Sequence, residues 1–374
     1  MIPTGVISAD VVVIGAGPAG CSAALNLAPF RDVLMLDLCR GGQQRVGESL
    51  PAAAGPLLRA MHLEQAFLAQ GHAPCHATHS TWGAARVIEQ DALRNLDGHG
   101  WHLDRHRFDA WLKGVAVERG AACLAYDRLL DIRRDPEPAA PWQLQLARKG
   151  RRLHVQARML IDASGRNSVL ARYLNGTRRR AGKLACGWLI GQASGAAGIS
   201  QLHTEPDGWW YGAPLPGGRR LLAFHTDADL PAAQAAHSVQ GLLARLGAAP
   251  HLLGALAETG FTASDEHGFC AAHGQVLEPP CGDGWLAVGD AALAFDPLSA
   301  QGVFNALYTG LAGAEAAQRF LKGAPEALAG YAAQVARIEQ AYAGHLHAWY
   351  AEERRWPESR FWQRRRGAEP LQAL

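Results

Sequence analysis

The chain has 374 residues, a mass of 40.0 kDa and a formal net charge of +2, which arises from 36 basic and 34 acidic side chains. A hydrophobic fraction of 48% with 19% charged residues excludes a largely disordered chain, and the length corresponds to about two domains. The near-zero charge excludes a nucleic-acid binder that relies on bulk positive charge.

The predicted elements alternate between strand and helix at the start of the chain. Residues 10–14 are typical of a buried parallel strand, a glycine-rich turn and an alanine-rich helix follow to about residue 28, and residues 33–36 form a second strand. This order predicts an α/β chain with a Rossmann-like domain. Further along we expect loop and helix over 40–60, a strand at 101–103, a helix over 107–119, and strands near 121–133, 142–148 and 153–161. The middle of the chain is expected to form aromatic strands at 188–191, 209–211 and 221–224 and a helix over 232–246. A strand at 285–288 follows, and the chain is then expected to be helical from residue 304 almost to the end.

The cysteines and the absence of targeting signals indicate the compartment. The seven cysteines are scattered and none forms CxxC, which argues against a disulfide framework or a zinc ribbon. The chain carries neither a secretion signal pattern nor an unbroken run of 18 apolar residues, so we expect a cytoplasmic protein without membrane contact. The histidines over 72–79 and 99–106 lie in loop and strand segments without acidic partners at ligand spacing, so no metal site is expected.

A glycine motif directly follows the first strand. Gly15, Gly17 and Gly20 have the spacing of a dinucleotide-binding turn, in which the glycines allow the tight turn, the approach of a pyrophosphate and close packing of helix on strand. Ala19 lies in the first turn of the helix, whose N–H groups face the phosphates in such folds. Asp37 ends the second strand, where a carboxylate can accept hydrogen bonds from an adenosine ribose. We expect all five residues to bind a dinucleotide cofactor.

Five further motifs, spread in order over most of the chain, point to the kind of dinucleotide. They are R-V-G-E-S-L-P at 45–51, D-R at 104–105 before F-D at 108–109, D-A-S-G-R at 162–166, G-D-A-A at 289–292 and D-P-L-S-A-Q-G at 296–302. With these motifs the chain resembles FAD-dependent monooxygenases of the hydroxybenzoate-hydroxylase type and their flavin halogenase relatives. The resemblance implies that FAD is the cofactor. It also implies cofactor contacts from Arg45, Arg105, Asp162, Gly165, Asp290, Pro297, Gln301 and Gly302. The last loop leads into a helix near residue 304, whose N–H donors and dipole suit the negative charge of a reduced flavin.

A narrower resemblance concerns flavoproteins that mature tryptophylquinone enzymes. It rests on G-W-H-L-D-R at 100–105, W-W-Y at 209–211, E-R-R-W-P at 353–357 and F-W at 361–362. Members of that family act on a tryptophan in the precursor of a partner oxidase. The resemblance implies an FAD-dependent monooxygenase that uses O2, through a flavin C4a-hydroperoxide, to hydroxylate a tryptophan or another indole-type ring. FAD would be reduced by NAD(P)H or by a partner flavin reductase.

Halogenation is the main competing activity. Flavin halogenases carry a lysine after the loop that corresponds to 45–51, and W-x-W-x-I-P in the middle of the chain. Here residues 52–112 contain no lysine, and 209–214 reads W-W-Y-G-A-P. Both departures favour hydroxylation. Two more functions fit the same motifs: hydroxylation of a small natural product, and a chaperone role in which the flavoprotein docks an oxidase precursor without turning over.

Four residues are candidates for direct participation in the reaction. Glu48 suits proton transfer, although a loop carboxylate is equally often a hydrogen-bonding strut. His79 is the best histidine for acid–base chemistry, with a surface histidine as the more ordinary interpretation. Trp210 and Tyr211, with Trp209, suit an indole-sized pocket, but alternate strand residues face opposite sides, so we expect at least one of the three in the sheet core.

The order of the motifs predicts a discontinuous FAD-binding domain. We expect it to comprise 1–50, 85–170 and 275–325, with a β-rich substrate domain inserted as 51–84 and 171–274. A C-terminal helical tail over 326–374 completes the chain. Six arginines between 354 and 366 alternate with aromatic residues. This tail either packs its aromatic residues onto the body of the protein or docks an acidic partner such as a precursor protein.

Overall fold

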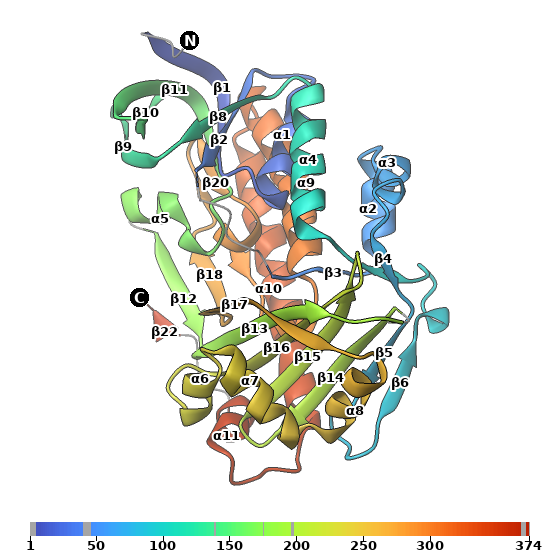
Figure 1. The fold of residues 1–374 in the computed structure, drawn as a ribbon. Coiled ribbons are helices and arrows are strands. Elements are labelled where there is room, and N and C mark those ends of the chain that lie inside the picture. Colours follow the sequence, from blue (N-terminus) through green and yellow to red (C-terminus); the bar gives the residue numbers. More distant parts are fainter. Residues whose placement is uncertain are drawn as a thin grey trace.

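The structure is a computed structural model, and it describes residues 5–39, 46–137, 140–174, 176–195, 198–367 and 372–373. Figure 1 shows the predicted α/β architecture, with a parallel sheet and its helices above a large antiparallel sheet. Arg45, one of the expected cofactor contacts, lies outside the described residues.

The parallel sheet forms the predicted Rossmann-like part. Its strand order is β19-β20-β11-β1-β2-β8, and β1 pairs in parallel with β11 on one side and β2 on the other. The strands are β1 (Val6–Ile14), β2 (Val33–Leu38), β8 (Ala122–Tyr126), β11 (Arg151–Asp162), β19 (Cys281–Gly282) and β20 (Trp285–Ala287), with β9 (Arg128–Arg134) and β10 (Trp142–Arg148) attached to β11. The β-branched run of β1 is fully buried, as expected for a central strand covered on both faces.

Three helices cover one face of this sheet and share its main hydrophobic cluster. They are α1 (Pro18–Leu27), α4 (Arg105–Glu118) and α9 (Gly302–Leu321). Helices α1 and α9 approach each other closely at Gly310 of α9, where a Cβ would lie 2.5 Å from the Ala19 carbonyl oxygen. The third glycine of the turn likewise allows α1 to pack closely on the chain that precedes it. Helix α1 therefore sits between the first strand and α9, with its N-terminus at the end of β1.

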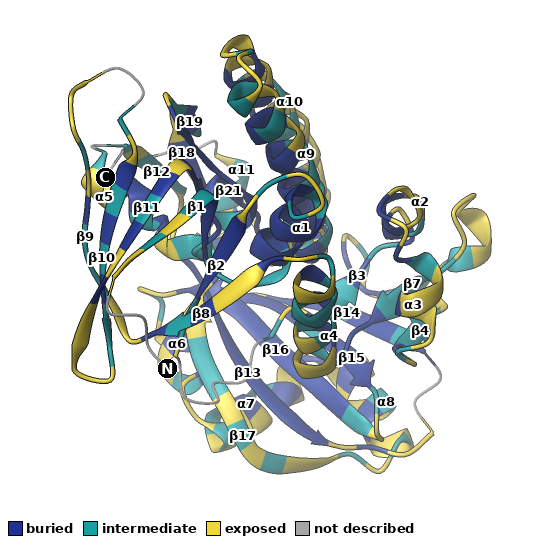
Figure 2. Cartoon of the chain, turned by 90° about the horizontal axis from the view of Figure 1, so that it is seen from above, coloured by how far each residue is buried: buried dark blue, intermediate teal, exposed yellow. Residues whose placement is uncertain are grey.

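The antiparallel sheet has seven strands in the order β17-β13-β16-β15-β14-β5-β6, and its pairs are antiparallel except β14 with β5, which pair in parallel. These are β5 (Ala77–Ser80), β6 (Ile88–Asp91), β13 (Leu184–Gln192), β14 (Ile199–Glu205), β15 (Gly208–Leu215), β16 (Arg219–Asp227) and β17 (Thr262–Ala271). Figure 2 shows β13 and β16 largely buried, whereas the edge strand β17 is mostly intermediate or exposed. One face packs against α6 (Pro231–Ala235), α7 (Val239–Arg245) and α8 (Pro250–Glu258), and the other packs against the C-terminal segment.

Two small sheets and three short helices join these layers. One sheet contains β3 (Ser49–Leu50), β7 (Gly100–His102) and β4 (Ala73–Cys75), and the other contains β21 (Leu293–Ala294), β18 (Gly274–Glu278), β12 (Thr177–Ala181) and β22 (Gln372–Ala373). The short helices are α2 (Ala54–Ala60), α3 (Glu64–Leu68) and α5 (Val169–Tyr173). Within the described ranges, no helix combines the length and apolar character needed to span a bilayer.

Two segments pack or pair across the predicted division into domains. Residues 54–68, assigned to the substrate domain, place Leu57, Leu58 and Phe67 in the same hydrophobic cluster as α1 and α4. Strand β6, assigned to the FAD-binding domain, pairs with β5 at the edge of the antiparallel sheet. The predicted boundaries followed the motifs, whereas burial of apolar side chains decides which layer a motif-free segment joins.

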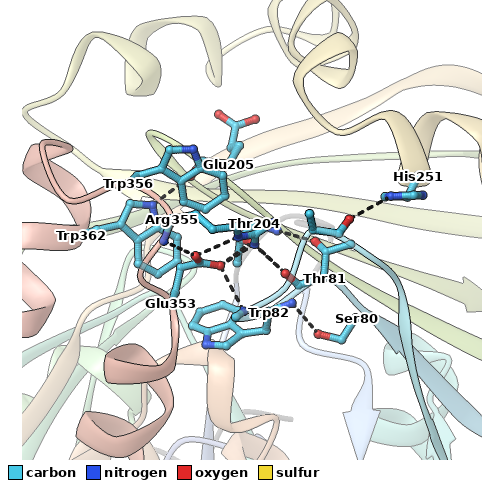
Figure 3. A network of polar contacts seen from close by, with 12 residues as sticks. Ser80, Thr81, Trp82, Thr204, Glu205, His251, Glu353, Arg355, Trp356 and Trp362 are labelled. Atoms are coloured by element: carbon cyan, nitrogen blue, oxygen red, sulfur yellow. Dashed lines mark hydrogen bonds and ion pairs between the residues drawn. The ribbon is translucent and has the colours of Figure 1, made fainter.

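The C-terminal segment packs on the antiparallel sheet and is joined to it by hydrogen bonds, as Figure 3 shows. After α10 (Glu326–Glu352), the buried Glu353 carboxylate accepts hydrogen bonds from the Gly83 backbone (3.1 Å) and from the Thr204 hydroxyl (2.9 Å). The indole of Trp362, in α11 (Arg360–Arg366), is fully buried and donates to the Glu205 carbonyl oxygen at 2.9 Å. Phe361 and Trp362 of the tail are both 0% exposed. These two aromatic residues therefore pack onto the body of the protein, which is one of the two roles considered for the tail.

Candidate functional site

The glycine turn forms a cradle without side chains. Gly15 has a φ of +115°, and a Cβ there would lie 2.4 Å from the Ala163 carbonyl oxygen; a Cβ at Gly20 would lie 1.9 Å from the oxygen of Gly15 itself. Gly17 is the N-cap of α1, and no described side chain caps that helix. Its first N–H groups are therefore open to a ligand, which fits the pyrophosphate of a dinucleotide.

Asp37 lies at the carboxyl end of β2, as the ribose contact requires. Its carboxylate accepts a hydrogen bond from Lys113 Nζ of α4 at 3.0 Å, and both side chains are partly exposed. This hydrogen bond raises the pKa of Lys113. The sequence did not single out Lys113, because its partner comes from another element 76 positions away.

Asp162 and Gly165 form the turn that follows β11, next to the glycine cradle. One Asp162 oxygen accepts from both the backbone N–H (3.0 Å) and the hydroxyl (2.6 Å) of Ser164, and the other accepts from the Leu170 N–H at 2.7 Å. The carboxylate is fully buried and engaged by its own turn. It therefore shapes the wall against which Gly15 packs, and its oxygens are not free to bind a cofactor directly.

The residues expected around the flavin ring and ribityl chain converge between β7 and α9. Arg105, at the start of α4, donates to the Gly47 carbonyl oxygen at 2.8 Å and pairs with Asp109. Asp290 is half-buried 3.6 Å from the Arg166 guanidinium; burial raises its pKa, and the positive charges of Arg166 and Arg105 oppose that rise.

The loop before α9 presents backbone to the same region. Pro297, Gln301 and Gly302 are exposed, and no described side chain caps α9. The 20-residue helix therefore directs open N–H groups and its positive dipole end outward. This donor set fits the pyrimidine edge of an isoalloxazine ring, so the residues present are compatible with FAD.

Glu48 lies at the base of a recess between this region and the antiparallel sheet. The recess is lined by Val46, Glu48, Leu103, Asp104, Arg105, Ile190, Leu215, Arg219 and Leu221. Glu48 is only 3% exposed, and its carboxylate accepts a hydrogen bond from the Gly47 N–H at 3.1 Å. Burial raises the pKa of Glu48, opposed by hydrogen bonding to Gly47 and Tyr211 and by the Arg105 charge. The carboxyl can therefore hold a proton at a higher pH than an ordinary glutamate.

Tyr211 of β15 brings a hydroxyl to the buried side of Glu48. This hydroxyl is buried and makes no hydrogen bond of good geometry within the described part of the chain, although the fields of Glu48 and Ser200 both affect its pKa. Ser200 in turn lies 2.8 Å from His102 Nε2 and 3.5 Å from the Cys75 thiol. The result is a buried polar cluster of residues 48, 75, 102, 200 and 211, beside the recess.

Within this cluster, His102 is held neutral. Burial, with the nearby charge of Arg220, lowers the pKa of His102 to about 4. Its second ring nitrogen, Nδ1, has no hydrogen-bond partner among the described residues. Ser200 belongs to no sequence motif, and His102 lies within the motif at 100–105 but was not named as a site residue; the hydrogen bond between them joins positions 98 residues apart.

Two of the four predicted catalytic residues lie elsewhere. Trp210 points to the opposite face of the sheet from Tyr211, where it is fully buried against Phe224 and donates to Glu205 at 3.0 Å. His79 lies near the far edge of the sheet on β5 and pairs with Glu89 of β6 at 2.9 Å. The structure thus brings Glu48 and Tyr211 together and separates Trp210 and His79 from them, because strand alternation and sheet order, not sequence proximity, set these positions.

Comparisons with known proteins agree with this geometry. The tryptophan halogenase family model matches residues 85–374. Among curated proteins, the chain is 29% identical over 381 residues to LodB, an FAD-dependent oxidoreductase of Marinomonas mediterranea, covering 98% of this chain and 99% of LodB. It is 24% identical over 354 residues to tryptophan 2-halogenase of Chondromyces crocatus, covering 91% of this chain but 66% of that longer protein.

Solved structures show the same fold. The myxobacterial chondrochloren halogenase CndH superposes with a TM-score of 0.85 at 22% identity, covering 96% of this chain and 86% of CndH. QhpG, a peptidyl tryptophan dihydroxylase essential for tryptophylquinone cofactor biogenesis, superposes with a TM-score of 0.73 at 25% identity, covering 98% of this chain and 80% of QhpG. With a family model matched over more than three quarters of its length, the chain belongs to the tryptophan halogenase family of flavin-dependent enzymes.

Proposed function

We propose that this chain is an FAD-dependent monooxygenase that hydroxylates a tryptophan side chain in a precursor protein during the maturation of a tryptophylquinone cofactor. The likeness to QhpG supports a tryptophan side chain as the substrate, and the near full-length match to LodB supports an FAD-dependent oxidoreductase. Membership of the halogenase family alone does not distinguish oxygen transfer from halogen transfer. The distinction rests on one observation, the placement of the lysines.

All four lysines of the chain lie away from the recess at Glu48. Lys113 pairs with Asp37 at the expected ribose end, and Lys183 pairs with Asp229 beyond the antiparallel sheet. Lys149 lies in the turn between β10 and β11, and Lys322 caps the end of α9. The halogenases that this chain resembles carry a lysine to receive the oxidised halogen. Without such an amine at the recess, direct transfer of oxygen to an electron-rich ring is the better supported chemistry.

The residues at the recess have roles that suit an indole substrate. Bound FAD, reduced by NAD(P)H or by a partner flavin reductase, supplies the activation of O2. Ile190, Leu215 and Leu221 give the recess an apolar wall on the sheet side, which excludes water from the ring to be hydroxylated. Glu48, with its raised pKa, is placed to take or return the proton that the ring loses on hydroxylation, and the neighbouring Tyr211 hydroxyl moderates the rise in that pKa.

A mass measurement on the substrate tests the proposal. The FAD-loaded chain, a flavin reductase and O2 are incubated with a tryptophan-containing precursor segment, in parallel with and without chloride or bromide. The proposal expects addition of oxygen to tryptophan that does not depend on halide, with 18O incorporated from 18O2. Replacement of hydrogen by halogen would instead establish the second candidate, flavin-dependent halogenation, which the family match favours.

The same incubation distinguishes the small-molecule hydroxylase and the chaperone. Oxygenation of free tryptophan or of small indoles, but not of the precursor segment, would indicate a hydroxylase of small molecules. Binding of the precursor without any product, with simple reoxidation of the flavin, would indicate a chaperone. A matched pair of variants, Glu48→Gln at the recess and His79→Gln at the sheet edge, locates the chemistry: the first is expected to lower the hydroxylation rate at least tenfold and the second to leave it unchanged.

A further inference from the structure

Two cysteines face one another across neighbouring strands of the antiparallel sheet. Cys186 of β13 is the register partner of Cys270 on β17. Directly opposed residues in an antiparallel pair have Cα atoms about 4.5–5.5 Å apart, inside the range of roughly 4.4–6.8 Å that a disulfide spans. Both thiols are free in the structure. The backbone spacing at this register pair is therefore compatible with a disulfide between the two cysteines.

The two thiols differ in access and acidity. Cys186 is buried, whereas Cys270 is exposed on the edge strand. The hydrogen bond from Cys186 lowers the pKa of Cys270 to about 7, and the charge of Arg166 acts in the same direction. The same contact raises the pKa of Cys186. An accessible thiolate beside a buried second thiol is the arrangement found where a cysteine is oxidised and then resolved as a disulfide.

The pair lies on the face of the sheet that carries Tyr211. Cys186 belongs to the hydrophobic cluster of Trp188 and Trp209, and the charge of Glu48 reaches its thiol. The Trp188 indole lies over Gly268 of β17, where a Cβ would approach its ring carbon to 2.7 Å. The indole thereby packs on β17 two residues from Cys270.

We propose that Cys186 and Cys270 form a reversible dithiol–disulfide site that reacts with hydrogen peroxide. The Cys270 thiolate attacks one peroxide oxygen, the O–O bond breaks, and hydroxide leaves and is protonated to water, giving a sulfenic acid. The Cys186 thiol then attacks that sulfur, the S–S bond forms and a second water leaves. Two thiols lose two electrons in total and one peroxide gains them. A small dithiol restores the reduced pair. The site does not depend on which substrate the flavin oxidises.

Peptide mapping of the full-length protein tests this site. The reduced chain is treated with a slight excess of hydrogen peroxide, blocked with an alkylating agent, digested without reductant and analysed by mass spectrometry. We expect a cross-linked pair of peptides that contain Cys186 and Cys270, and its disappearance after dithiothreitol. We also expect Cys270 to be oxidised about tenfold faster than the exposed Cys39, since rate follows thiolate character and access.

Single variants separate the two steps. Cys186→Ser should leave a sulfenic acid on Cys270 that a cyclic 1,3-diketone traps, and Cys270→Ser should abolish the cross-link. Cys39→Ser is the matched control and should leave it unchanged. Equal oxidation rates at Cys270 and Cys39, or peroxide-treated wild-type protein without the cross-linked peptide, would overturn the proposal. The wild-type mapping decides the matter even if a variant folds poorly.

Discussion

Replacement of Tyr211 by phenylalanine is expected to stabilise the protein while impairing its reaction. The hydroxyl of Tyr211 is buried and makes no good hydrogen bond within the described residues, so folding removes it from water without a full replacement for its hydrogen bonds to water. Tyr211→Phe keeps the ring and its packing in the cluster of the sheet, and deletes only that group.

The expected magnitude follows from the cost of an unpaired buried polar group, which is about 1–3 kcal/mol. Part of that cost is offset by the fields of Ser200 and Glu48 around the hydroxyl. We therefore expect the free energy of unfolding to rise by roughly 1 kcal/mol in Tyr211→Phe. Loss of the Tyr211 contact should also raise the pKa of Glu48 further, because that contact lowers it in the wild type.

Tyr331→Phe is the matched control with the opposite sign. Its hydroxyl is also buried but donates to the Ala287 carbonyl oxygen at 2.6 Å, so its removal leaves a buried carbonyl group unpaired. We expect a loss of about 1–2 kcal/mol in urea-induced unfolding. If Tyr211→Phe loses as much stability as Tyr331→Phe, the hydroxyl of Tyr211 has a partner and the reasoning fails. If Tyr211→Phe hydroxylates substrate at the wild-type rate with an unshifted pH profile, the hydroxyl has no part in setting the pKa of Glu48.

Three further outcomes are expected. Trp362→Ala should lower the free energy of unfolding, measured in urea, by about 3–5 kcal/mol, since the indole is fully buried. Trp349 is 38% exposed, so Trp349→Ala should lower it by less than about 1 kcal/mol. Equal losses in the two variants would contradict the packing of α11. Burial lowers the pKa of His225 to about 3, below its unfolded value near 6.5. The contribution of His225 to the free energy of unfolding is therefore complete above about pH 6.5. It is lost as the pH falls toward 3, at up to about 1.4 kcal/mol per pH unit, because the unfolded chain then binds a proton that the folded chain does not. His225→Phe should flatten the dependence of unfolding free energy on pH between 7 and 4, and an unchanged slope would refute the assignment. Gly20→Ala should yield protein without flavin absorbance, because the added Cβ would collide with the glycine turn. Gly344 lies in open space on α10, so Gly344→Ala should retain flavin and raise the free energy of unfolding by roughly 0.5–1 kcal/mol. Flavin retained by Gly20→Ala would count against the cradle.

The parts of the fold that were predictable from the sequence are those that local pattern determines. The strand at Val11–Ile14, the turn at Gly15 and the helix after it follow from β-branched residues, glycine geometry and alanine content within one short segment. Asp37 lies near the carboxyl end of its strand, which begins at Val33 as expected from the apolar run and continues to Leu38. The family assignment followed from motifs that each stay within a few residues.

The candidate site was only half predictable, since it is assembled from distant positions. Glu48 and Tyr211 were named as site residues, whereas two residues that complete the cluster were not: Ser200 lies in a strand without a motif, and His102 lies within the motif at 100–105 without being singled out. Trp210 was grouped with Tyr211 by adjacency, although the two side chains lie on opposite faces. Asp162 matched a motif, but its oxygens are used within its own turn. Strand order and hydrogen-bond saturation are properties of the folded chain, and no window of sequence contains them.

The attachment of the C-terminal segment also sets the order in which the protein can finish folding. Trp362 completes a cluster whose other members include Trp188 and Trp209, and its hydrogen bond to Glu205 joins positions 157 residues apart. Contacts between residues so far apart in the sequence form late in folding, because the entropy of closing a long loop must be lost before the contact contributes any favourable energy. During synthesis the seven strands of the sheet leave the ribosome well before residues 353–362, with one apolar face still uncovered. The protein therefore depends on its last helix to hide that face, and a chain interrupted before it would expose a tryptophan-rich surface prone to aggregation.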